Sequence, residues 1–360
     1  MSKVVSYKEI MAFHPGYYIS DMIEEMEITQ EEFAIRLGTT AKTISKLVNG
    51  SCNVTQDLAC KLSMMLGTSI EFWLNLQKKY DEKVAEIDQK KSIDEQEPIL
   101  DMIDYPYFVN NFGLPNVKNT LEKIKNLCAF LKVASLNVFN NRDFLVNFRT
   151  GVSDITQKNI VNSRVWVQAA MNIATEMQTQ VFDAEKLSSY LPEIRSMTVK
   201  EPKEFAPRLK EIFNDCGIAF VVLPTLKNSG INGAVRWINK HKVMLAMNNR
   251  KLSTDIFWFS LFHEIKHLMQ HKSADSYSFE NGFDKEEDDA DRFAQNHLIP
   301  LVDYLKLNPS KYIKDEEIIR FANQIGVHPG IVAGRLEHDK IIHANRSAKF
   351  KEKIDIESFM

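Results

Sequence analysis

Hydrophobic positions in the first 80 residues recur with a helical period, broken at regular points by glycine. Thr29 is a suitable N-cap, and Glu32 follows three residues later, as a capping box requires. The next apolar stripe ends at Gly38, a typical position for a helix C-terminus. The same pattern predicts further helices over residues 40–48, 55–66 and 70–80. We therefore expect a small all-α domain over residues 1–80.

The rest of the chain divides by changes in pattern. Residues 81–104 are rich in charge and predict a helix extension and linker. Residues 105–204 have helical periodicity without a chemical motif, which predicts an α-helical middle region. Residues 205–305 contain β-rich runs at 217–223, 232–238 and 242–247, followed by helical patterns at 253–271 and 285–299. Strands followed by helices are typical of an α+β domain. Residues 306–360 predict a helical C-terminal extension, so the expected fold is multidomain and mostly α-helical.

Composition excludes several classes of protein. Apolar residues make up 44% and charged residues 26% of the 360 residues, which is ordinary for a globular protein. No run approaches the roughly 20 apolar residues of a membrane helix, and the first residues lack the apolar core of a signal peptide. The four cysteines are scattered without a CxxC pair, which fits a reducing cytosol. We therefore expect a cytoplasmic protein without a membrane partner.

The glycine-broken helices also carry a candidate DNA-binding surface. Two short helices joined at Gly38 are typical of a helix-turn-helix, whose second helix enters the major groove of DNA. The net charge of the chain is only −3, so DNA binding requires a local patch. Residues 39–51 contain two lysines and no acid, and the expected DNA-facing residues are Thr39, Thr40, Lys42, Thr43, Lys46 and Asn49. The alternative is a small helical domain with these residues as a solvated face.

A second motif, His-Glu-x-x-His, lies in the predicted helix 253–271. Residues i and i+4 share one helix face, so His263 and His267 can bind one zinc ion with Glu264 beside them as a general base. A metal-free His-Glu-His helix face is the alternative.

A hydrolytic zinc site needs a third protein ligand, and three residues are candidates. His271 lies on the same helix, where three ligands converge poorly, and Glu280 falls in a predicted loop. Glu287, at the start of the next helix, is the preferred ligand. Asp291 follows one turn later and is expected to hold the free ring N–H of a ligand histidine. The remaining acids of 284–291 are explained as a solvated helix start.

Residues 14–80 resemble the HigA/VapI-type antitoxins of the Xre helix-turn-helix family. The resemblance is carried by His14-Pro15-Gly16 and by the stretches ITQEEFAIRLG, TISKLVNG and LGTSIEFWLNLQKKYD, although Tyr17 stands where the family commonly has an acid. It implies operator DNA as a partner, a homodimer and repression of the chain's own operon.

Residues 205–305 resemble the ImmA/IrrE family of zinc metallopeptidases. The matching stretches are GINGAVRWI, FSLFHEIKHLMQH and EDDADRFAQNHLIP. The resemblance implies a zincin-like fold with His263, His267 and Glu287 as zinc ligands and Glu264 as catalytic base. The tail from residue 316 to 340 also has the pattern of a helix-turn-helix, for which packing is the preferred interpretation.

Together the two motifs favour a cytoplasmic regulator that binds operator DNA and cleaves a protein, namely a toxin, a repressor or the chain itself. One alternative is an antitoxin and repressor whose zinc domain senses a signal or binds a toxin without hydrolysis. The other is a peptidase whose helix-turn-helix only docks a protein. As a further hypothesis, a substrate backbone pairs with the strand segment Gly233, Ala234 and Val235, where the small side chains permit close approach.

Overall fold

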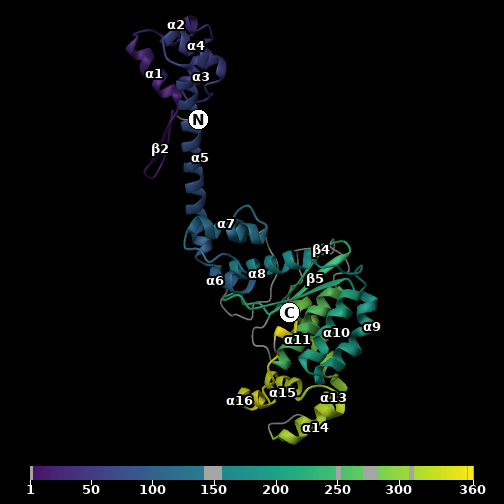
Figure 1. The fold of residues 1–360 in the computed structure, drawn as a ribbon. Helices are drawn as coiled ribbons and strands as arrows, with labels where there is room; N and C mark the ends of the chain where they lie inside the picture. Colours follow the sequence, from purple (N-terminus) through teal and green to yellow (C-terminus); the bar gives the residue numbers. More distant parts are fainter. Residues whose placement is uncertain are drawn as a thin grey trace. The chain divides into compact units, whose positions relative to one another are not determined.

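The computed structural model describes residues 3–141, 156–248, 253–270, 283–307, 312–354 and 356–359. The chain divides into two compact units, residues 1–98 and 99–360. Most elements are helices, and the sheets are small, which confirms the predicted mostly α-helical, multidomain class (Figure 1). Within the described residues, no helix combines the length and apolarity needed to cross a membrane.

Unit 1 contains the predicted helices and a hairpin that the sequence pattern did not indicate. The hairpin joins β1 (Val4–Tyr7) and β2 (Ile10–Phe13) in antiparallel register. Its turn passes through Lys8 with a φ of 52°, where a glycine or asparagine would have marked it. The hairpin is tied to α5 by the Tyr7 hydroxyl, which donates to Asp94 at 2.9 Å, and by the 2.6 Å ion pair between Lys8 and Asp94.

The five helices of unit 1 begin and end where the capping residues indicate. They are α1 (Pro15–Glu25), α2 (Gln30–Leu37), α3 (Ala41–Val48), α4 (Gln56–Leu66) and α5 (Ile70–Leu100). Thr29 caps α2 by accepting from the Glu32 backbone N–H at 3.1 Å, and Gly38 ends it with a left-handed φ of 69°. The core includes Phe33, Ile44, Leu47 and Trp73, all fully buried.

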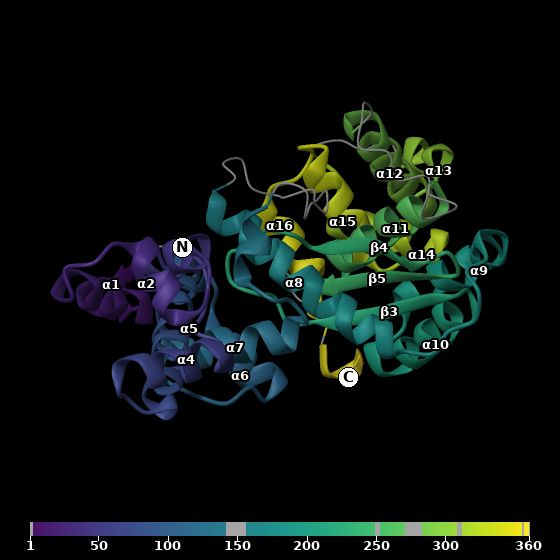
Figure 2. The ribbon, with the colours of Figure 1, turned by 90° about the horizontal axis from the view of Figure 1, so that it is seen from above.

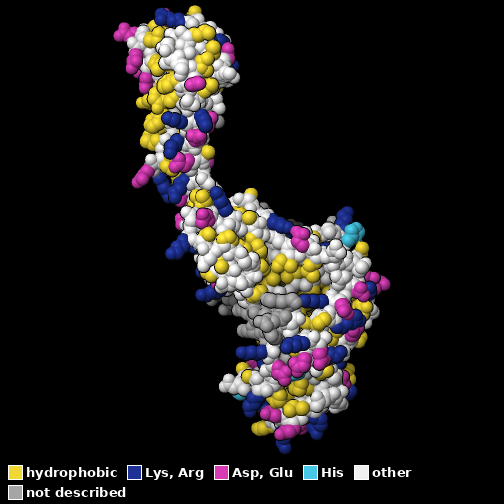
Figure 3. Space-filling model, viewed as in Figure 1, with side chains coloured by type: hydrophobic (Ala, Val, Ile, Leu, Met, Phe, Trp, Pro, Cys, Tyr) yellow, Lys and Arg dark blue, Asp and Glu magenta, His cyan; other side chains and the backbone are white. Residues whose placement is uncertain are grey.

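The charged stretch 81–104 is helical as far as Leu100, because it continues α5. Basic and acidic side chains alternate along this helix (Figure 3), and ion pairs between residues 78 and 82 and between 83 and 86 stabilise its exposed face. Pro98 is accommodated only near the helix end.

Unit 2 has a three-stranded sheet at its centre. The strands are β3 (Ile218–Leu223), β4 (Gly233–Asn239) and β5 (Lys242–Asn248), in the order β3-β5-β4. β3 is parallel to β5, and β4 is antiparallel to it. The burial of nearly every residue of β3 and β5 explains their continuous apolar runs.

Helices cover both faces of this sheet (Figures 1 and 2). α8 (Gln157–Glu176) packs against all three strands, whereas α11 (Thr254–Gln270) packs against β4 and β5 from the other side. Residues 105–204 therefore belong to the same compact unit as the sheet. Trp166 of α8 and Tyr107 of α6 (Tyr105–Phe112) both donate to the carbonyl oxygen of Pro224, at 2.9 and 2.7 Å.

Unit 2 contains further helices besides α6, α8 and α11. They are α7 (Thr120–Leu131), α9 (Ala184–Ser196), α10 (Pro202–Asp215), α12 (Phe283–Leu298), α13 (Leu301–Lys306), α14 (Asp315–Ile325), α15 (Pro329–His338) and α16 (Ala344–Ser347). Short 3-10 turns lie at Leu136–Asn140, Met197–Val199, Ala348–Phe350 and Ile356–Phe359. Five residues of α15 are buried, including Val332 and Leu336, and α15 packs against α11. This agrees with a packing role for the second helix-turn-helix pattern.

Candidate metal centre and DNA-binding helix

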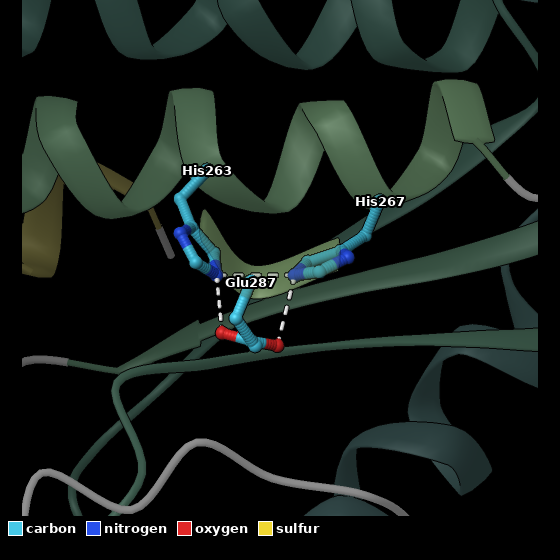
Figure 4. A group of neighbouring side chains, drawn as sticks. All are labelled: His263, His267 and Glu287. Carbon is cyan, nitrogen blue, oxygen red and sulfur yellow. Dashed lines mark hydrogen bonds and ion pairs between the residues drawn. The ribbon is translucent and has the colours of Figure 1, made fainter. Parts of the chain in front are cut away.

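His263 and His267 lie one turn apart on α11 and point to the same side (Figure 4). Their Nε2 atoms are 3.1 Å apart. The opposite side of the helix is anchored in the core by buried apolar residues, among them Trp258, Phe262 and Ile265. The i, i+4 spacing therefore produces the paired imidazoles that the sequence predicted.

The N-terminus of α11 is held by the C-terminal segment of the chain, a contact that sequence patterns could not reveal. The Thr254 backbone N–H donates to the Glu352 carbonyl at 2.9 Å. Lys351 forms ion pairs with Asp255 of α11 at 2.9 Å and with Glu337 of α15 at 2.6 Å. We call this set of contacts the Lys351 clamp. It fixes the position of the helix that carries both histidines.

α12 packs against α11 and brings Glu287 to the imidazoles (Figure 4). The two carboxylate oxygens lie 3.2 Å from His263 Nε2 and 3.3 Å from His267 Nε2. Ligands bound tetrahedrally to zinc at about 2.0–2.1 Å would lie about 3.3–3.4 Å from one another. One ligand atom from each of the three side chains lies within 4.8 Å of the others, so this cluster of described residues is compatible with a metal site.

Asp291 lies one turn beyond Glu287, and its Oδ1 is 2.9 Å from His263 Nδ1. Donation of the Nδ1 proton to this carboxylate means that release of the second proton would come from Nε2, which faces Glu287 and His267, and would give the tautomer that a metal ligand needs. The other two candidates for the third ligand, His271 and Glu280, lie outside the described residues.

Carboxylates give the site a strong preference for positive charge. Burial opposes protonation of His263, but hydrogen bonds to Asp291 and Glu287 outweigh it and raise the pKa of His263 to about 9. Burial likewise opposes ionisation of Glu287, yet hydrogen bonds from both histidines hold the pKa of its carboxyl well below the usual range. Surroundings that stabilise a protonated imidazole also favour a bound cation.

Glu287 is paired with both histidines, whereas Glu264 lies on the same helix as the histidines and contacts the position of Gly233. Burial raises the pKa of its carboxyl, although both histidines oppose the shift. A carboxyl with a raised pKa next to a metal site is suited to accept and release a proton near neutral pH.

The predicted substrate segment Gly233, Ala234 and Val235 begins β4, which ends the strand order of the described sheet. Ala234 and Val235 are buried and pair with Ala246 and Leu245 of β5. The space that a side chain at position 233 would occupy holds the Glu264 side chain.

In unit 1, α3 presents the predicted DNA-facing residues with unequal exposure. Thr40, Lys42, Lys46 and Asn49 are exposed, whereas Thr39 and Thr43 are half-buried. The Thr40 hydroxyl caps α3 by accepting from the Thr43 backbone N–H at 3.1 Å, so it also has a structural role. Ser45 is half-buried and lies three residues after Lys42 and four before Asn49, a spacing that could have added it to the predicted surface.

Comparison with known proteins agrees with both parts of this description. The helix-turn-helix family model matches residues 19–73, and the model of the IrrE N-terminal-like domain, a peptidase family, matches residues 224–337. Virulence-associated protein I of Dichelobacter nodosus is 32% identical over 91 residues, which are 25% of this chain and 84% of that protein. The chain belongs to the HigA/VapI helix-turn-helix family.

Two further relatives were found. The uncharacterized HTH-type transcriptional regulator YddM of Escherichia coli is 36% identical over 78 residues, covering 21% of this chain and 83% of that protein. The Pseudomonas aeruginosa antitoxin HigA, solved with the higBA promoter, is 29% identical with a TM-score of 0.22, covering 24% of this chain and 94% of that one. This HigA/VapI-type chain thus combines the family's domain with an IrrE N-terminal-like domain, and both resemblances seen in the sequence are confirmed.

Proposed function

We propose that this chain is a DNA-binding regulator and antitoxin with a zinc-dependent peptidase in unit 2. The observation that carries the peptidase part is the convergence of His263, His267 and Glu287 within 4.8 Å, with Glu264 on the same helix. The three side chains would hold zinc, which when bound polarises a peptide carbonyl and acidifies a water molecule.

The chain's own residues would perform the remaining steps. Asp291 keeps His263 in the ligating tautomer. Glu264 takes a proton from the attacking water and transfers it to the leaving amine nitrogen. β4, at the end of the sheet order and beside Glu264, would align an extended substrate through backbone hydrogen bonds near Gly233–Val235.

For unit 1, we propose binding of operator DNA through α3 and repression of the chain's own operon, as a homodimer. Support comes from the exposed Lys42 and Lys46 on an acid-free helix and from relatives described as HTH-type transcriptional regulators. The protein partner would be a cognate toxin or a protein substrate. The four cysteines, all among the described residues, form no disulfide, which fits action in the cytoplasm.

Metal analysis and one substitution test the peptidase. We expect about one zinc per chain, lost when His263→Ala and His267→Ala are combined and in Glu287→Ala. Glu264→Gln retains size and removes the base, so it should keep zinc and abolish cleavage of the chain itself or of the product of an adjacent toxin gene, followed by mass spectrometry. Equal zinc content in the wild type and in the double variant would refute the assignment of His263 and His267 as zinc ligands. Zinc binding without cleavage by the wild type would favour the sensing or toxin-binding alternative.

A further inference from the structure

Gly233 occupies the first position of β4, and the space beside it is already filled. Its backbone does not have a left-handed φ, so conformation alone does not require glycine there. A Cβ atom at this position would lie 2.9 Å from Oε1, 3.0 Å from Cγ and 3.1 Å from Cδ of Glu264. All three contacts involve one side chain, and all are shorter than the roughly 3.5 Å of a comfortable contact.

The crowding reaches into the Glu264 side chain, since Cγ is involved as well as the carboxylate. A larger residue at 233 would therefore require rotation of the whole side chain, and α11 is fixed by its packing and by the Lys351 clamp. We propose that Gly233 is a positioning residue. Because it has no side chain, its backbone lies close to the Glu264 side chain and sets the orientation of the carboxylate. This role rests on the proposed function of Glu264 as the general base.

The placement also gives β4 two tasks. A glycine in a strand often marks a site where another group approaches the backbone closely, and here that group is the Glu264 side chain. If substrate pairs along β4, one strand sets both the position of the scissile carbonyl and the position of the base. The geometry of proton transfer is then defined within a single element, without a loop between the two groups.

A double-mutant cycle on the metal-free protein tests the contact without any need for cleavage. Gly233→Ala should lower the melting temperature of unit 2 by about 2–4 °C. The same substitution should cost nothing in the Glu264→Ala background, because the crowding atoms are gone. Gly334→Ala is the matched control: its Cβ would lie 2.7 Å from Asp255 Oδ2, so its cost should be equal in both backgrounds. An equal cost of Gly233→Ala in both backgrounds would overturn the proposal.

A crystal structure of Gly233→Ala distinguishes positioning from simple crowding. We expect the Glu264 carboxylate to move by at least about 0.5 Å while both imidazoles stay in place. A carboxylate that stays while β4 retreats would refute the positioning role. If the wild type cleaves its substrate, kcat should fall about 100-fold with KM unchanged. Absence of zinc or of cleavage in the wild type would count against the proposed function. The double-mutant cycle would still measure the coupling between Gly233 and Glu264, so the two failures can be told apart.

Discussion

At the scale of single residues, the candidate metal centre depends on which ring nitrogens of His263 carry protons as well as on where the side chains lie. His263 has two ring nitrogens with different partners: Nδ1 faces Asp291, and Nε2 faces Glu287 and His267. Because Asp291 accepts the Nδ1 proton, metal binding would displace the proton on Nε2, the nitrogen directed at the cluster. We therefore expect the affinity for metal to depend on Asp291, a carboxylate outside the cluster.

Asp291→Ala should therefore weaken zinc binding about 10–100-fold without removing a ligand. Competition with a chromophoric chelator measures the affinity. Asp288→Ala provides the control, since Asp288 is an exposed acid on the same helix. Equal affinities of the two variants would show that helix charge, and not the contact with His263, determines the effect.

At the scale of elements, α3 and α11 are each defined by what holds their N-terminus. Thr40 caps α3 within the local sequence, whereas α11 depends on Lys351, almost 100 residues further along the chain. This difference explains what the sequence could predict. Helix caps and the i, i+4 histidine pair depend on neighbouring residues, so the sequence could predict them, and the same holds for Glu287 at the start of a helix. The Lys351 clamp and the Gly233–Glu264 contact form only when distant segments of the chain pack together, so the sequence gives no local signal for them.

Removal of the α3 lysines should weaken DNA binding to all sequences. Lys42→Ala and Lys46→Ala should each lower the salt dependence of log K by roughly one if each lysine contacts a phosphate. Fluorescence anisotropy with the native promoter at several salt concentrations measures the slope. Lys79→Ala, an exposed lysine of α5, should leave the slope unchanged. Wild-type slopes in both α3 variants would refute the assignment of the recognition helix.

Loss of the Lys351 clamp should destabilise unit 2. Lys351→Met leaves Asp255 and Glu337 without their shared cation, and because Asp255 is buried and Glu337 half-buried, we expect a loss of about 3 kcal/mol at most. Thermal unfolding followed by circular dichroism measures it. Lys349→Met, at an exposed neighbouring position, should have almost no effect. Similar melting curves for the two variants would mean that the ion pairs contribute little.

At the scale of the whole molecule, the boundary between the two units falls where sequence patterns are least informative. The charged stretch after residue 80 predicted a helix extension followed by a linker, and α5 continues to Leu100 with Tyr80, Val84 and Ile87 packed in one cluster with the hairpin. The middle region lacks a motif and was therefore separated from the sheet domain. In the structure, α8 covers one face of that sheet. Burial by a helix from elsewhere in the chain leaves no local signal.

The unit boundary leads to a prediction about fragments. A fragment of residues 99–360 should unfold cooperatively and bind one zinc, whereas residues 205–360 should aggregate or remain unfolded, because the sheet face beneath α8 would be exposed. Calorimetry and metal analysis of both fragments test this. Cooperative unfolding of the shorter fragment would show that the helical middle region is dispensable for the fold.

The Lys351 clamp also affects the order in which the parts of the chain fold during synthesis. During synthesis, N-terminal units fold first, at roughly 5–20 residues per second. Unit 1 is complete at residue 98, whereas α11 gains its anchor only after Lys351 has left the ribosome. At that rate the two events are separated by roughly 10–50 s. A nascent chain would therefore contain a folded helix-turn-helix unit well before the histidine pair of α11 is fixed in place.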